Sequence, residues 1–209
     1  MDKSSISSKT LYRLLIYQRC LRKLIENGIE TVSSSALAKA AGVKPAQLRK
    51  DLANFGQIGT RGLGYPVDDL ADAIREFLGS TSLQPVILIG AGNLGSALMR
   101  YDGFNRGGFE VIGAFDLFPQ SVAGKDITVP VYPMDTLTTF IQQKKVKLAI
   151  LCVPGEHAQE VANTLSLAGI GGILNFSPTV LQVPPSVTVN NVDLALELEN
   201  LSYFVTQES

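Results

Sequence analysis

The chain has 209 residues, of which 45% are hydrophobic and 18% charged, and this suffices for one large domain or two small ones. It contains no apolar run near the roughly 18 residues of a membrane span and no signal-peptide pattern, so we expect a cytoplasmic protein without membrane contact. Cys20 and Cys152 are too few for a disulfide framework and lack metal-ligand spacing, so we expect buried thiols and no bound metal.

Charge is distributed unevenly along the chain. Residues 1–65 contain eleven Lys and Arg but four Asp and Glu, a net charge of +7, and the remainder contains seven bases and fifteen acids, a net charge of -8. Such asymmetry is typical of a nucleic-acid-binding segment joined to a domain with a different task. A solvated basic face would give the same count, so charge alone leaves both interpretations open.

The basic segment is predicted to hold three helices and a wing. In "SSKTLYRLLIYQRCLRKLIENG" apolar residues recur at spacings of three and four, which is typical of a helix with one buried face. Serines before "ALAKAAG" and Pro45 before "AQLRKDLANFG" are helix-start signals, and with Gly42 between them these two helices resemble a helix-turn-helix. The glycines of "GQIGTRGLGY" predict a two-stranded wing with Arg61 near its tip.

The second half has the pattern of an α/β fold. After a linker helix predicted in "VDDLADAIREFLG", strands alternate with helices, which favours a parallel, doubly wound sheet. The predicted strands are "PVILIG", "FEVIGAFD", "KLAILCVP", "GGILNFS" and "VTVNN", and the predicted helices are residues 93–106, "DTLTTFIQQ" and "HAQEVANTLSLAG". The chain ends in "DLALELENLSYFV", where Leu194, Leu198, Leu201 and Val205 form an apolar stripe at helical spacing.

A dinucleotide site is predicted where the first of these strands meets its helix. Gly90, Gly92 and Gly95 form GxGxxG in the strand-to-helix context that gives this motif its meaning. Asp116 ends the next strand, about 20 residues further on, where a carboxylate binds the ribose hydroxyls and repels a 2'-phosphate, which favours NAD(H) over NADP(H). Alternatively, Asp116 merely begins a turn.

No catalyst accompanies this site in the sequence. The single histidine, His157, is expected at a helix start on the surface rather than as a general acid or base. Two other interpretations remain open: a small NAD-dependent oxidoreductase whose basic helices only pack or dimerise, and a CoA-binding Rossmann module, against which Asp116 argues.

Five segments together resemble the Rex family of redox-sensing transcriptional repressors: "GVKPAQLRKDL", "FGQIGTRGLGY", "GAGNLGSAL", "GGILNFSP" and "NVDLALELENLSYF". The resemblance implies a non-enzymatic repressor that binds operator DNA as a homodimer with exchanged C-terminal helices, senses the NADH/NAD+ ratio and is released by NADH. It further implies a winged-helix DNA-binding domain with linker helix at 1–78, an NAD(H)-binding Rossmann domain at 79–192 and a dimerisation helix at 193–209. The sequence leaves open whether the last helix packs on its own subunit instead.

The resemblance also implies functional residues. DNA contacts are expected from Ser33, Ser34, Lys44, Gln47, Arg49, Lys50 and Arg61, although helix capping would equally explain the two serines. Cofactor contacts are expected from Gly90, Ala91, Gly92, Asn93, Leu94, Gly95, Tyr101, Asp116, Val153, Pro154, Asn175, Phe176 and Ser177. Tyr101, Asp193 and Arg13 are expected to form the switch, with Arg13 pairing Asp193 across the dimer; alternatively, Tyr101 is an ordinary core residue.

Overall fold

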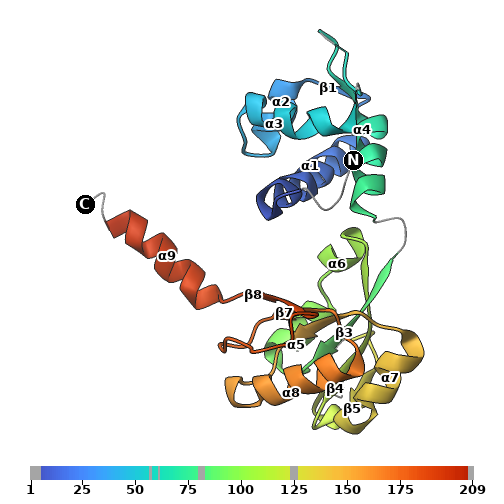
Figure 1. Cartoon of the computed structure of the whole chain (residues 1–209), viewed down its shortest axis with the longest axis vertical. Helices are drawn as coiled ribbons and strands as arrows, with labels where there is room; N and C mark the ends of the chain where they lie inside the picture. The colour runs from blue at the N-terminus through green and yellow to red at the C-terminus, as the bar shows by residue number, and fades with distance from the viewer. Residues whose placement is uncertain (1–5, 57, 61, 80–82, 123–126, 207–209) are drawn as a thin grey trace. The chain divides into compact units, whose positions relative to one another are not determined.

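The computed structural model describes residues 6–56, 58–60, 62–79, 83–122 and 127–206. The chain divides into two compact units, Met1–Ser82 and Leu83–Ser209, each with its own hydrophobic core (Figure 1). Arg61, predicted at the wing tip, lies outside the described residues.

The first unit is built from helices, as predicted. Ser7 and Ser33 cap α1 and α2 by accepting backbone N–H groups, and Pro45 occupies the first turn of α3. Buried side chains from all four α-helices form the core, and α1 packs against α4. The elements are α1 (Ser8–Glu26), β1 (Thr31–Val32), α2 (Ser34–Ala40), α3 (Pro45–Leu52), the 3-10 turn η2 (Ala53–Phe55), β2 (Tyr65–Pro66) and α4 (Val67–Leu78).

The wing is smaller than the predicted two-stranded hairpin. Among its described residues, Thr60 and Gly64 form a single antiparallel bridge, with N–H to carbonyl distances of 2.9 and 3.0 Å. The chain after this bridge pairs as β2 with β1, the strand that precedes α2. Gly64 has φ +94°, and a Cβ there would collide with the Val32 carbonyl, so glycine is required where the wing joins this small sheet.

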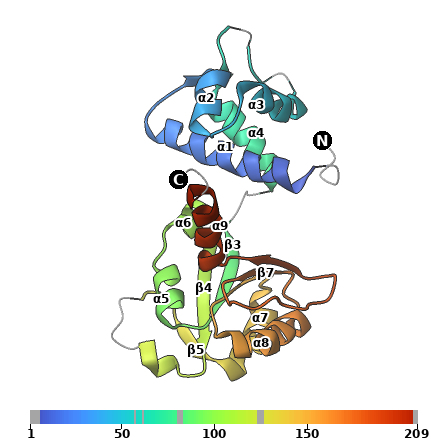
Figure 2. The ribbon, with the colours of Figure 1, turned by 90° about the vertical axis from the view of Figure 1, so that its left-hand side faces the viewer.

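The second unit contains a six-stranded parallel sheet in the order β5-β4-β3-β6-β7-β8, which is the strand order of a dinucleotide-binding Rossmann fold. Helix α5 covers one face, and α7 and α8 cover the other (Figure 2). Five strands match the prediction, whereas β5 was missed because only three residues pair. The strands are β3 (Gln84–Ile89), β4 (Phe109–Asp116), β5 (Val131–Pro133), β6 (Leu148–Leu151), β7 (Gly172–Asn175) and β8 (Thr188–Asn191).

The helix predicted over residues 93–106 is two helices. Backbone N–H groups of Arg100 and Tyr101 bond three residues back, to Ala97 and Leu98, which ends the first helix. The Tyr101 ring then lies over Gly103, where any Cβ would meet the ring, so Gly103 permits the sharp entry into the second helix. The helices of this unit are α5 (Asn93–Met99), α6 (Gly103–Arg106), α7 (Leu137–Lys144) and α8 (Gly155–Ala168), with 3-10 turns η3 (Pro119–Val122) and η4 (Met134–Thr136).

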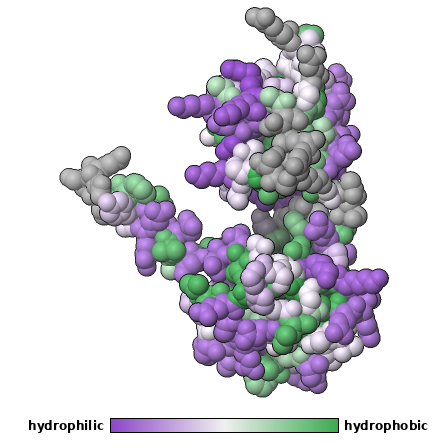
Figure 3. Space-filling view, in the orientation of Figure 1, coloured by the Kyte–Doolittle hydropathy of each residue, from purple (hydrophilic) through white to green (hydrophobic). Residues whose placement is uncertain are grey.

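Helix α9 (Leu194–Thr206) forms as predicted, but its apolar stripe has no covering surface within the described chain. Leu194 and Leu201 are each 60% exposed and Leu198 is 67% exposed. The apolar groups on this helix are visible in Figure 3. The alternative that the stripe packs on its own subunit is therefore not observed in the described residues.

Candidate functional site

A buried carboxylate joins the first and third helices of the N-terminal unit. Asp51, at the end of α3, is 3% exposed and accepts two hydrogen bonds from Arg13 of α1, from Nε at 2.6 Å and from Nη2 at 2.7 Å. It also accepts bonds from the Tyr17 hydroxyl and the Gln47 amide, both at 2.8 Å. This network fixes α3 against α1, next to the apolar core to which Tyr17 and Leu48 belong.

These contacts decide the charge state of the network. Burial by itself raises the pKa of Asp51, but the hydrogen bonds from Arg13, Tyr17 and Gln47 outweigh it, and the pKa lies below its usual range. The hydrogen bond to Asp51 raises the pKa of Arg13, and burial together with that carboxylate raises the pKa of Tyr17 well above its usual value. Asp51 is therefore an anion that can only accept hydrogen bonds at neutral pH.

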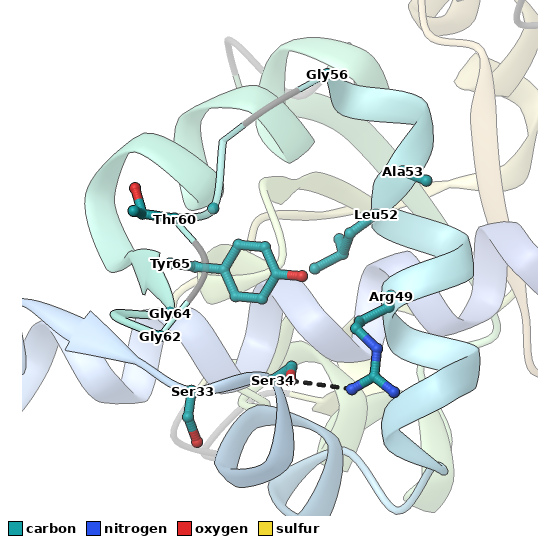
Figure 4. Close-up of a pocket in the computed structure, with 11 residues that line it drawn as sticks. Ser33, Ser34, Arg49, Leu52, Ala53, Gly56, Thr60, Gly62, Gly64 and Tyr65 are labelled. Carbon is teal, nitrogen blue, oxygen red and sulfur yellow. Dashed lines mark hydrogen bonds between the residues drawn. The ribbon is translucent and has the colours of Figure 1, made fainter.

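A hollow of about 520 Å3 lies between α3, the start of α2 and the wing (Figure 4). Arg49 donates from Nη1 to Ser34 Oγ at 3.3 Å across this hollow, and the Tyr65 ring points across it toward Leu52. Its described lining residues are Ser33, Ser34, Arg49, Leu52, Ala53, Gly56, Gly59, Thr60, Gly62, Gly64 and Tyr65. Three of the predicted DNA contacts, Ser33, Ser34 and Arg49, thus come together at one surface.

Apart from Arg61, the other predicted DNA contacts lie on α3 or at its N-cap. Lys44 at its N-terminus and Lys50 near its end are exposed, and Gln47 is half-buried because its amide reaches Asp51. Figure 3 shows hydrophilic residues gathered over α2 and α3. Ser33 Oγ accepts the Ala36 N–H at 3.1 Å, so the capping role considered for this serine is present.

In the second unit, each glycine of the motif has a distinct geometric reason. Gly90 has φ +93°, and a Cβ there would lie 2.6 Å from the carbonyl oxygen of Cys152, just after the neighbouring strand β6. Gly95 packs against the Gly90 carbonyl so closely that a Cβ would overlap it. Gly92 faces open space, where backbone can approach a ligand. These are the three roles that the GxGxxG pattern predicts.

Asp116 ties the glycine loop to the next strand. Its Oδ2 accepts the Ala91 N–H at 2.7 Å and its Oδ1 accepts the Phe118 N–H at 2.8 Å. The carboxylate thus holds the loop in place while remaining half-buried at the carboxyl end of β4. The turn considered as an alternative for Asp116 is present as well, in its bond to Phe118.

A cavity of about 600 Å3 opens at the carboxyl ends of β3, β4 and β6, where the strand order reverses. Open sheets of this kind bind ligands in such a crevice. The described lining residues are Gly90, Gly92, Phe115, Asp116, Leu117, Phe118, Met134, Asp135, Cys152, Val153, Pro154, His157, Glu160, Val161 and Thr164. Five predicted cofactor residues, namely Gly90, Gly92, Asp116, Val153 and Pro154, are thereby brought together.

The lining also contains residues that sequence reasoning missed. Asp135 and Glu160 join Asp116, whereas no Lys or Arg occurs among the described lining residues. His157 is exposed near the start of α8, as predicted, and in addition lines the cavity. The sheet topology could have indicated His157 and Glu160. Strand β6 lies beside β3, so α8, which follows β6, begins next to the crevice at the carboxyl ends of these strands.

Several predicted cofactor residues do not line this cavity. Tyr101 is 55% exposed, which excludes the core role, and packs edge-to-face on Phe104 beside a separate hollow of about 350 Å3. Asn175 is fully buried; its Nδ2 donates to Asn191 and to the Thr179 carbonyl, each at 2.9 Å. Ala91, Asn93, Leu94 and Gly95 belong to the glycine loop and first turn of α5, while Phe176 and Ser177 belong to the loop after β7.

The predicted switch residues have local partners. Asp193 Oδ1 accepts the N–H groups of Ala195 and Leu196, at 3.0 and 3.1 Å, and thereby caps α9. Arg13 is engaged by Asp51, a partner that the sequence did not reveal. Within the described residues, Arg13 and Asp193 of the same chain are not in contact.

Neither cysteine is chemically activated. Burial raises the pKa of both thiols, that of Cys152 to about 12, so both are protonated at neutral pH. Among the described residues, no cluster of three or more His, Cys, Asp or Glu side chains is placed to hold a metal ion. No described helix has the length and apolarity needed to cross a bilayer.

Fold and sites define a class: a protein with an N-terminal winged helical unit and a Rossmann unit for a dinucleotide. Two family models match it, one described as "Putative DNA-binding protein N-terminus" at residues 5–53 and one as "CoA binding domain" at residues 81–179. The redox-sensing transcriptional repressor Rex of Pelotomaculum thermopropionicum is 43% identical over 208 residues, 100% of this chain and 98% of its own. Rex of Carboxydothermus hydrogenoformans is 44% identical, covering all of both chains.

Solved structures agree with these relatives. The crystal structure of RSP with beta-NAD+ and operator DNA matches with a TM-score of 0.87 and 39% identity, covering 97% of this chain and 94% of RSP. RSP with beta-NADH matches with a TM-score of 0.83 and 38% identity, covering 98% and 96%. The chain belongs to the Rex family of redox-sensing transcriptional repressors.

Proposed function

We propose that this protein is a DNA-binding transcriptional repressor that senses the NADH/NAD+ ratio and leaves its operator when NADH binds. The observation that carries this proposal is the pairing, in one chain, of a cationic helix α3 with a glycine-loop cavity that contains Asp116. Relatives over the full length are named as repressors, not enzymes, which supports a regulatory role. Such a protein works beside DNA, in the cytoplasm.

The cavity suits NAD(H) better than CoA or NADP(H). Gly92 leaves room for backbone to approach a pyrophosphate, and Asp116 can accept ribose hydroxyls while it holds Ala91. CoA and NADP(H) each carry an additional phosphate on the adenosine ribose, and among the described lining residues three carboxylates and no Lys or Arg would face it. We therefore assign the adenosine half of NAD(H) to this cavity, although the family model of this segment is a CoA-binding one.

On the DNA side, α3 acts as the recognition helix. Gln47, Arg49 and Lys50 face the major groove, and Lys44 with the hydroxyls of Ser33 and Ser34 contacts phosphates. Arg61 of the wing enters an A·T-rich minor groove, where the negative potential attracts a guanidinium. The exposure of Lys44, Arg49 and Lys50 and the shared hollow of Arg49 and Ser34 support this assignment.

A homodimer supplies a surface that covers the apolar side chains of α9. Its apolar side chains are all exposed in the described chain, and burial on a second copy would remove about 25 cal/mol for each Å2 of apolar surface from water. A two-fold dimer then presents two α3 helices to half-sites one or two helical turns apart, hence to an inverted repeat. We keep residues 193–209 as the dimerisation segment, 1–78 as the DNA-binding part and 79–192 as the Rossmann part.

NADH and NAD+ differ at the nicotinamide, which is neutral in NADH and cationic in NAD+. The sensing residues must therefore surround that ring, and a ligand shifts a conformational equilibrium only by its differential affinity. Exposed Tyr101 and Asp193 at the start of α9 are the residues we place there, together with Phe176 and Ser177 of the loop after β7, while the buried Asn175 orients that loop by accepting the Ser177 N–H. Closure of the dimer around the neutral ring moves the two α3 helices out of register with the DNA.

Arg13 takes part in two contacts of this switch. Its Nε and Nη2 already donate to Asp51, so a pairing with Asp193 of a partner subunit would use Nη1 or replace the bonds to Asp51. In either case the switch contact and the anchor of α3 involve the same side chain. A movement of α9 would thereby act on α3 directly.

Fluorescence anisotropy on an inverted-repeat duplex with TTGTG-type half-sites, without cofactor and with NAD+ or NADH, tests the proposal. We expect tight, salt-dependent binding that NADH abolishes and NAD+ preserves, and that Arg49→Ala weakens. Linkage requires operator DNA to weaken NADH binding by the same factor, which titration calorimetry measures. Binding of NADH without specific DNA binding would instead favour the small oxidoreductase, for which turnover of a carbonyl or alcohol is the test.

A further inference from the structure

The Gln47 side chain has a defined direction. It lies on α3 one turn before Asp51, and its Nε2 donates to Asp51 Oδ1 at 2.8 Å. Because the ionised carboxylate accepts only, the amide must turn its nitrogen inward, and the reverse orientation would set two acceptors against each other. No described residue donates a hydrogen bond to Gln47 Oε1, and this atom is not fully buried, so it is available to an outside donor.

The Asp51 carboxylate is itself held in one orientation, so it cannot rotate to suit the other orientation of the Gln47 amide. Arg13 donates to both of its oxygens and Tyr17 donates to Oδ2, and Asp51 as a residue is 3% exposed. Rotation of the carboxylate would break charge-assisted bonds of 2.6 to 2.8 Å. The orientation of the Gln47 amide is therefore set from the interior of the domain.

The neighbours of Gln47 on α3 have the opposite chemistry. Lys44, Arg49 and Lys50 carry only donors, which suit phosphates and the acceptor edges of guanine or thymine. Base donors in the major groove are the exocyclic amino groups, N6 of adenine and N4 of cytosine. Gln47 thus offers the α3 surface an acceptor at one defined position.

We propose that Asp51 is a positioning residue for sequence readout, which turns Gln47 Oε1 outward so that each α3 helix selects a base with an exocyclic amino group at one place in the half-site. This inference rests on the proposed DNA-binding function. The remaining proton of Nε2 can serve adenine N7, which gives adenine two bonds and cytosine one.

The test measures binding to duplexes in which one base at a time lacks its amino group. Purine replaces each adenine, and 2-pyrimidinone each cytosine, in both half-sites, and anisotropy gives Kd for wild type, Gln47→Ala and Lys50→Ala. We expect one position where removal of the amino group raises the Kd of wild type about tenfold or more. At that position, Gln47→Ala should bind the modified and unmodified duplexes equally. In Lys50→Ala, used as the matched control, that positional loss should persist.

Two further variants test the role of Asp51. Asp51→Asn offers Gln47 either an oxygen or a nitrogen, so the amide can reverse and the tenfold discrimination should fall several-fold. Tyr17→Phe removes another bond to the same carboxylate but leaves Gln47 in place, and its discrimination should equal that of wild type. Circular dichroism checks that each variant is folded; if Asp51→Asn is not, the Gln47→Ala cycle still decides whether Gln47 reads an amino group.

The outcomes separate this inference from the proposed function. If wild type binds no inverted-repeat duplex specifically, the repressor proposal itself fails. If wild type binds but every amino-group deletion costs Gln47→Ala as much as wild type, Gln47 does not read an amino group and the inference is overturned. A folded Asp51→Asn protein with unchanged discrimination would overturn the positioning role alone.

Discussion

The two units of the molecule each depend on one aspartate, and the two carboxylates are used differently. Asp51 is buried and receives hydrogen bonds from side chains of two helices, up to 38 residues away in sequence. Asp116 is half-buried and accepts two backbone N–H groups beside a cavity of about 600 Å3. Asp51 has its hydrogen bonds within its own unit, whereas Asp116 remains accessible to a ligand in the cavity.

This difference indicates which part of each unit can respond to a ligand. A closed network of charge-assisted bonds fixes α3 in one orientation, so a signal has to move it as a body or break the network. In the Rossmann unit, a ligand can approach the backbone at Gly92, where an added Cβ would meet no atom within 4 Å. The sensing unit thus has space for a ligand next to its glycine loop, whereas the hydrogen bonds of Asp51 in the DNA-binding unit are all made within that unit.

Removing Arg13 should have the largest effect, because it breaks the closed network. Arg13→Ala leaves Asp51 buried without its cation, which we expect to lower the free energy of unfolding of the N-terminal unit by about 3 kcal/mol. This is the lower end of the range for a broken buried pair, since Tyr17 and Gln47 still donate to Asp51. Urea unfolding measures the loss.

The Arg75–Asp72 pair provides the matched control, because both side chains are largely exposed. Arg75→Ala should cost less than about 1 kcal/mol. Equal losses in the two variants would contradict the structural importance of the Asp51 network.

The glycine loop should separate folding from ligand binding. Gly95→Ala forces a methyl group against the Gly90 carbonyl, which should cost about 2 kcal/mol of stability and lower Tm. Gly92→Ala meets no atom within 4 Å, so Tm should be retained while NADH affinity falls, because the methyl group points into the space for the cofactor. Differential scanning fluorimetry with and without NADH measures both effects, and a Gly92→Ala protein with full NADH affinity would place the pyrophosphate elsewhere.

A smaller, more selective change is expected from Asp116→Asn. The amide still has an oxygen for one N–H but loses its charge, so NADH affinity should fall about tenfold and the preference for NADH over NADPH should narrow. Asp135→Asn is the matched control, because it also removes a carboxylate from the cavity lining, whereas only Asp116 of the two accepts the Ala91 N–H of the glycine loop. Calorimetry with both cofactors compares them, and the assignment of the ribose to Asp116 fails if the two variants behave alike.

The sequence predicted what local patterns encode. The GxGxxG spacing located Asp116 and the loop, apolar periodicity located α1 and α9, and the alternation of strands and helices located α8. The strand β5 was missed because three paired residues leave no pattern, and the break between α5 and α6 depends on the Tyr101 ring over Gly103. Asp51 was missed because its partners Arg13 and Tyr17 come from a distant helix, and spacing along the chain carries no sign of such a contact.

The smallest expected effect is that of acid on stability, which should differ between the two units. The folded-state pKa of Asp51 lies below its unfolded value, so its stabilisation is complete above about pH 4 and is lost as the pH falls through the folded pKa. The loss is at most about 1.4 kcal/mol for each pH unit in that window. Hydrogen exchange between pH 3 and 6 should therefore show α1 and α3 losing protection more steeply than β3 and β6. Asp51→Asn should flatten this difference, since the variant has no proton to gain at that position, and an unchanged pH profile would assign the acid sensitivity to other carboxylates.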